Sequence, residues 1–119
     1  MTKVNKIQAG DNLKESILKA VNGLAGGQGG FQKFINKGDV VLLKPNFNTA
    51  DPPPASTDMN FLKAVVELVY EAGAKIVMIG ESSTMSMNTR KILEKRGVFD
   101  LLNMEQTIDM EMLQTTIVT

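Results

Sequence analysis

Two short apolar runs near the middle of the chain predict the central strands of a sheet. The first run is Val40–Leu43 and the second lies within Lys75–Gly80, and neither alternates with polar residues. Runs of this length without alternation are typical of parallel strands that are covered on both faces. We therefore expect two buried parallel strands joined by a helical crossover, and that crossover should be right-handed.

Three segments carry apolar residues at helical spacing. They are Leu13–Val21, Phe61–Ala72 and about Asn88–Arg96. Side chains that cap a helix stand before each one: Asp11 or Asn12, Thr57 or Asp58, and Ser86 or Asn88. Glycines stand where helices commonly end, at Gly23, Gly73 and Gly97. The pattern predicts three helices, the second of which packs closely on the sheet.

Two further segments complete the expected architecture. Lys3–Ala9 resembles a short opening strand with imperfect alternation, and Thr107–Met112 alternates apolar and acidic residues like a half-exposed fourth strand. Together with the central runs they predict a layered α/β fold with a mainly parallel sheet of about four strands and flanking helices. We expect residues 1–119 to form a single domain, because 119 residues support one core rather than two.

Two connections have biased compositions. The glycine run Gly26–Gly30 predicts a flexible link, because it lacks the spacing and the terminal Lys–Ser/Thr of a phosphate-binding loop. The connection Phe47–Asp58 contains three consecutive prolines, which favour a stiff exposed loop over a ligand for a partner domain.

The composition narrows the possible chemistry. Lys and Arg total 13 and so do Asp and Glu, so no overall charge favours nucleic acid or a membrane surface, and we expect neither as a partner. The absence of Cys and His excludes thiolate nucleophiles, iron–sulphur ligation and imidazole bases. Without Cys and His, a metal ion here would need oxygen ligands, as magnesium does. We assign no residue as a metal ligand. No apolar run approaches the length of a bilayer span, and we expect a cytoplasmic protein.

Polar side chains follow both central strands and form the candidate ligand site. The candidate residues are Lys44, Asn46, Glu81, Ser82, Ser83 and Thr84. In open α/β sheets, ligands bind beyond the carboxyl ends of the strands. Lys44 and Asn46 can hold a carboxylate or phosphate, and Glu81 can orient Lys44 or a magnesium ion. The same residues also fit a plain structural role, in which Lys44 is a solvated strand end and the hydroxyls cap the next helix.

Several small motifs in this order resemble the N-terminal part of domain-of-unknown-function family 362. The motifs are Lys44–Asn46, Ser56–Asp58, Glu71–Lys75, Ile79–Ser83 and Arg96–Phe99, and the resemblance covers about Lys3 through Leu102. The resemblance implies an iron–sulphur cluster elsewhere in longer members, which often carry a cysteine-rich, ferredoxin-like segment. This chain has no cysteine, so we expect no cofactor in it and interpret it as a fragment or a shortened relative.

Two functions remain open from these observations. The first is the binding of a small anionic ligand at the sheet edge, within an enzyme or redox assembly. The alternative is a protein-interaction or self-association module, in which the apolar face of Thr107–Met112 pairs with a second copy or with the remainder of a longer chain. An independent catalyst lacks a recognisable nucleophile–base pair.

Overall fold

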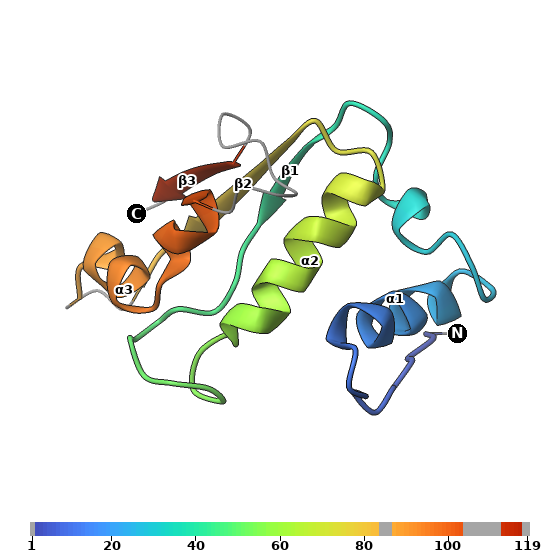
Figure 1. The fold of residues 1–119 in the computed structure, drawn as a ribbon, viewed down its shortest axis with the longest axis horizontal. Coiled ribbons are helices and arrows are strands. Elements are labelled where there is room, and N and C mark those ends of the chain that lie inside the picture. Colours follow the sequence, from blue (N-terminus) through green and yellow to red (C-terminus); the bar gives the residue numbers. More distant parts are fainter. Residues whose placement is uncertain (1, 84–86, 104–112, 118–119) are drawn as a thin grey trace.

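The computed structural model describes residues 2–83, 87–103 and 113–117. Its helices and strands follow one another as α1 (Leu13–Leu24), β1 (Val40–Leu43), α2 (Met59–Glu71), β2 (Ile76–Glu81), α3 (Thr89–Lys95) and β3 (Leu113–Ile117). Two short 3-10 helices, η1 (Phe31–Lys33) and η2 (Val98–Asn103), precede β1 and follow α3. Figure 1 shows α2 lying alongside the strands, with α1 on its outer side. The α/β class expected from the sequence is confirmed.

The sheet is parallel, with β2 between β1 and β3. Val41 is paired with Val77 and Leu43 with Ile79, while β3 pairs in parallel with the other side of β2. Among the described residues the sheet thus has three strands rather than about four. The predicted strand Thr107–Met112 lies outside the described residues, and β3 begins immediately after it. The sequence analysis does not predict β3, because its polar residues give no apolar strand pattern.

The core lies on one face of this sheet. Val77 and Ile79 of β2 join one buried cluster with residues of α2 and α3, namely Leu62, Val66, Val69, Ile92 and Leu93. The helices form where predicted: Asp58 caps α2 by accepting a hydrogen bond from the Phe61 amide at 2.9 Å, and Asn88 caps α3. The side chains of α2, α3 and β2 thus contribute to one shared core.

The prediction that Val40–Leu43 is covered on both faces was wrong, because one face of β1 is exposed. Val40 is 59% exposed and Leu42 57% exposed, whereas Val41 and Leu43 are half-buried. The alternation follows from the strand pleat, which points Val41 and Leu43 towards the core cluster and Val40 and Leu42 away from it. β1 is also an edge strand of the described sheet, so fewer neighbours cover it.

The N-terminal region differs from the prediction in two ways. Lys3–Ala9 forms no strand; it runs beside α1, where the Asn5 side-chain amide donates a hydrogen bond to the Ala20 carbonyl at 2.6 Å. Its imperfect alternation offers no continuous apolar face to a sheet. α1 also continues through Gly23 to Leu24, and positive φ angles first occur at Gly26. A second small cluster, formed by Ile17, Ala64 and Leu68, joins α1 to α2.

One end of the glycine run is fixed rather than flexible. The Gly30 amide donates to Oδ1 of Asn22 at 2.9 Å, and a Cβ atom on Gly30 would lie 2.5 Å from the Val21 carbonyl oxygen. Only glycine allows the chain to pass this close to α1. This contact places η1 and the start of β1 relative to the first helix.

Candidate functional site

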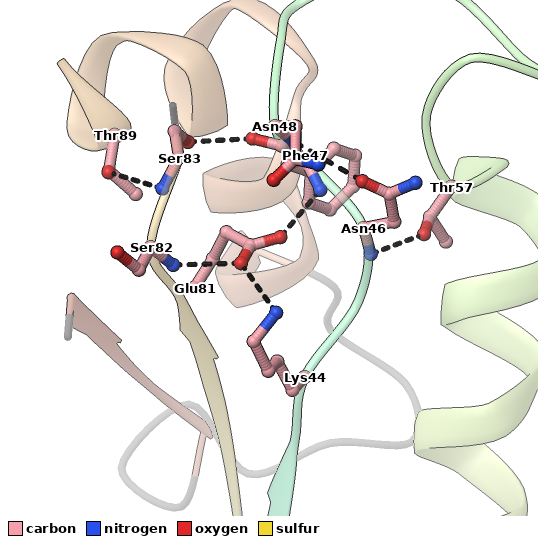
Figure 2. Close-up of polar contacts among 9 residues, drawn as sticks. All are labelled: Lys44, Asn46, Phe47, Asn48, Thr57, Glu81, Ser82, Ser83 and Thr89. Atoms are coloured by element: carbon pink, nitrogen blue, oxygen red, sulfur yellow. Dashed lines mark hydrogen bonds and ion pairs between the residues drawn. The ribbon is translucent and has the colours of Figure 1, made fainter. Parts of the chain in front are cut away.

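The loop that follows β1 is closed at its base by two hydrogen bonds. The Asn46 amide donates to Oγ1 of Thr57 at 2.8 Å, and the Thr57 amide donates to the Asn46 carbonyl at 2.9 Å. The proline-containing loop therefore leaves and returns at one point, beside the N-terminus of α2. This clamp holds the backbone after Lys44 in a defined position (Figure 2).

Glu81, the last residue of β2, is the centre of the site. Its Oε1 accepts hydrogen bonds from Nζ of Lys44 at 2.9 Å and from the Ser82 amide at 2.8 Å, and its Oε2 accepts one from the Phe47 amide at 2.6 Å. The carboxylate thus joins the segment after β1 to the segment after β2, as Figure 2 shows. A buried carboxylate requires such partners, because an unpaired charge away from water is costly.

The three donors also determine the ionisation of Glu81. Burial is the largest single influence and raises the pKa of this carboxyl group. The hydrogen bonds from the Phe47 amide, from Lys44 and from the Ser82 amide, with the charge of Lys44, lower it by more in total. The pKa of Glu81 therefore lies below its ordinary value, and the group is a carboxylate at neutral pH.

Lys44 and Glu81 form an ion pair with very unequal exposure. The side chain of Lys44 is 67% exposed and that of Glu81 is 0% exposed. An ammonium group has three N–H donors, and the bond to Glu81 uses one of them. The pair therefore presents a positive group that is held in place by a buried partner and still faces solvent.

Ser83 forms a second link between the two strand ends. Its Oγ donates to the Phe47 carbonyl at 2.6 Å, and its amide donates to Oγ1 of Thr89 at 3.0 Å. Both backbone polar groups of the fully buried Phe47 are thus bonded to residues at the end of β2. Ser83 serves to hold the loop, while the neighbouring Ser82 is exposed.

The structure brings five of the six candidate residues to one sheet edge. Lys44, Asn46, Glu81, Ser82 and Ser83 lie together, and Thr84 lies outside the described residues. Their role in ligand binding stays a prediction. Glu81 was expected to follow its strand, but it belongs to β2 and is buried.

Sequence reasoning missed two residues that build this site. From the sequence Phe47 is only part of a loop, although phenylalanine is among the residues most often buried in folded proteins. Thr57 is named from the sequence only as a candidate helix cap; in the structure it closes the loop, and Asp58 is the cap.

The comparison with known families places this chain in a family without an assigned activity. A family model described as domain of unknown function (DUF362) matches residues 41–118. The chain belongs to the DUF362 family. This result confirms the resemblance drawn from the motifs, and the matched region contains all six candidate site residues.

One curated relative of this DUF362 protein is the thylakoid-associated protein sll1697 of Synechocystis sp. The two are 35% identical over 101 residues, a stretch that covers 83% of this chain and 30% of the relative. The chain thus spans about 30% of the length of that relative. No solved structure matches the chain.

The residues of this chain do not fit an iron–sulphur cluster. The sequence contains no cysteine, and the described residues include no group of three Asp or Glu side chains able to hold a metal ion. Within the same described part of the chain, no helix is both long and apolar enough to cross a membrane.

Proposed function

We propose that this DUF362 domain binds a small anionic ligand at the edge formed by Lys44, Asn46 and Ser82. The observation that carries the proposal is the unequal exposure of the Lys44–Glu81 pair, because a buried carboxylate holds a solvent-facing ammonium group in place. A cation that is already positioned loses little side-chain entropy when an anion binds.

The position of the pair supports the same function. Lys44 lies at the carboxyl end of a parallel strand, where ligands of open α/β sheets bind. Asn46 is exposed on the same segment and can both donate to and accept from a ligand. The Asn46–Thr57 clamp and the Phe47–Glu81 bond keep this segment rigid.

The test is a titration of the protein with inorganic phosphate and with acetate, followed by NMR. Replacing the ammonium group in Lys44→Met should weaken binding at least about tenfold, because a charge-assisted hydrogen bond contributes about 1.5–3 kcal/mol. Lys63→Met, which removes an exposed lysine from α2, is the matched control and should bind as the wild type does. Unchanged affinity in Lys44→Met, or the absence of binding to either anion, would contradict the proposal.

A second candidate function, self-association through β1, is favoured by a separate observation. Among the described residues no strand pairs with the outer edge of β1, its four residues include no charge or proline, and its exposed Val40 and Leu42 border a largely apolar cavity of about 500 Å³ beside α1 and η1. Soluble proteins usually protect an edge strand with one of those features. A second copy of the chain that pairs with this edge would cover the exposed residues.

Sedimentation velocity across a range of concentrations tests this candidate. Leu42→Lys should shift an associated species towards monomer, whereas Leu18→Lys, on the exposed side of α1, should leave it unchanged. A wild-type chain that stays monomeric at high concentration would exclude self-association through β1.

A further inference from the structure

A small cavity adjoins the proposed anion site. Its volume is about 270 Å³, and Leu43, Phe61, Leu62 and Val65 form its apolar wall. Lys44 and Asn46 lie on its border, so the cavity and the candidate site share two residues.

Phe61 indicates that the cavity can accept apolar groups. It lies in the first turn of α2, borders the cavity and remains 45% exposed. Leu43 on β1 and Val65, one turn further along α2, are half-buried. An apolar group that entered the cavity would remove surface of all three side chains from water, which is favourable.

The charges favour a ligand with a single negative charge. Glu81 places a carboxylate 2.9 Å from the Lys44 ammonium, so the pair has no net charge of its own. A phosphate dianion would place two negative charges near the Glu81 carboxylate, whereas a ligand with one carboxylate group would place only one there. The repulsion between Glu81 and the ligand is therefore weaker for the carboxylate ligand. Ligand sites of this kind combine an apolar lining with a few polar groups that orient the ligand.

We infer that the ligand is a small amphiphilic carboxylate, whose charged end binds Lys44 and Asn46 and whose short apolar tail fills the cavity beside Phe61. This inference rests on the proposed function, because it places the anionic end of the ligand at the same lysine. It adds the substrate class, which the charged residues alone do not define.

An NMR titration with acetate, butyrate and hexanoate tests the inference. Affinity should rise along this series by up to about fourfold for each methylene group that is buried. Phe61→Ala should remove most of this gain and leave the affinity for acetate unchanged. Phe34→Ala, which removes an exposed phenylalanine from the segment after η1, is the matched control and should preserve the gain.

The outcomes separate this inference from the proposed function. If acetate and hexanoate bind equally and both depend on Lys44, the anion site stands and the tail cavity is wrong. If hexanoate binds equally to the wild type and to Lys44→Met, both proposals fail, because the charge then plays no part. Amide shifts at Phe61, Leu62 and Val65 that respond to hexanoate and not to acetate would support the inference even if Phe61→Ala is unstable.

Discussion

The two adjacent strands β1 and β2 are similar in sequence and differ in environment. Each contains a run of apolar residues, yet at every paired position the β1 residue is more exposed than its β2 partner: the β1 residues are exposed or half-buried, and their β2 partners are half-buried or buried. β2 lies between two strands and contributes buried side chains to the core, whereas β1 has a strand on one side only among the described elements. Apolar composition therefore predicted both strands, but position in the sheet determined which of them is buried.

The charged residues at the ends of the two strands also differ in exposure. β1 leads into an exposed lysine, and β2 ends in a buried glutamate that bonds to it. The central strand supplies the fixed partner, and the edge strand supplies the group that meets solvent. We expect substitutions in β2 to change stability, and substitutions in and after β1 to change binding or association.

The largest expected effect compares matched truncations in the two strands. Ile79→Ala should lower the free energy of unfolding by about 2–5 kcal/mol, because it leaves a cavity in the core. Leu42→Ala should lower it by less than about 1 kcal/mol, since the side chain is mostly exposed. Urea unfolding monitored by circular dichroism measures both. Equal losses would mean that Leu42 is covered in solution.

The next effect concerns the buried carboxylate. Glu81→Gln replaces one acceptor oxygen by an NH₂ group that faces another donor, and should cost about 1–3 kcal/mol of stability. The matched control is Glu94→Gln, which breaks the exposed ion pair with Arg90 and should cost only about 0.3–0.5 kcal/mol. The same unfolding experiment distinguishes them, and a Glu81→Gln protein as stable as the control would contradict the central role of Glu81.

The pH dependence of stability gives a smaller and independent signal. Because the folded pKa of Glu81 lies below its ordinary value of 4.5, the unfolded chain takes up this proton first as the pH falls. The contribution of Glu81 should be complete above pH 4.5 and should disappear as the pH falls through the lower folded value. Unfolding measured at a series of pH values should show a shallower acid slope for Glu81→Gln than for the wild type. Identical slopes would show that Glu81 titrates alike in both states.

The smallest effect on stability is expected for a charge on the exposed face of β1. Leu42→Lys should change the free energy of unfolding by no more than about 0.5 kcal/mol, because the new ammonium group stays in water. Ile79→Lys would bury the same charge and should prevent folding. Thermal melting compares the two variants. A severe loss in Leu42→Lys would show that another part of the protein covers this face.

Several elements could be predicted because they depend on neighbouring residues alone. The spacing of apolar residues located α2 and α3, and the candidate caps included Asn12, Asp58 and Asn88, all of which cap their helices. The parallel order of β1 and β2 followed from the helix between them. The prediction for Lys3–Ala9 was wrong, because a strand also needs a partner edge that accepts it.

The sequence predicted which residues lie at the candidate site, but only part of how they are arranged. Lys44, Asn46 and Glu81 were expected at one edge, since the ends of adjacent parallel strands meet there. The burial of Glu81 and the hydrogen bond that joins it to the Phe47 amide could not be read from the sequence, because both depend on how the two segments pack against each other.

The sequence by itself determined the order of the helices and strands and the chemical groups at their ends. Periodicity and capping act over a few residues, so they are readable along the chain. Only the tertiary structure decided which strand is exposed. It also decided that the side chain of Glu81 is buried and that the side chain of Lys44 faces solvent. Burial is a property of the whole packing arrangement, and residues far apart in the chain, such as Phe47 and Glu81, set it together.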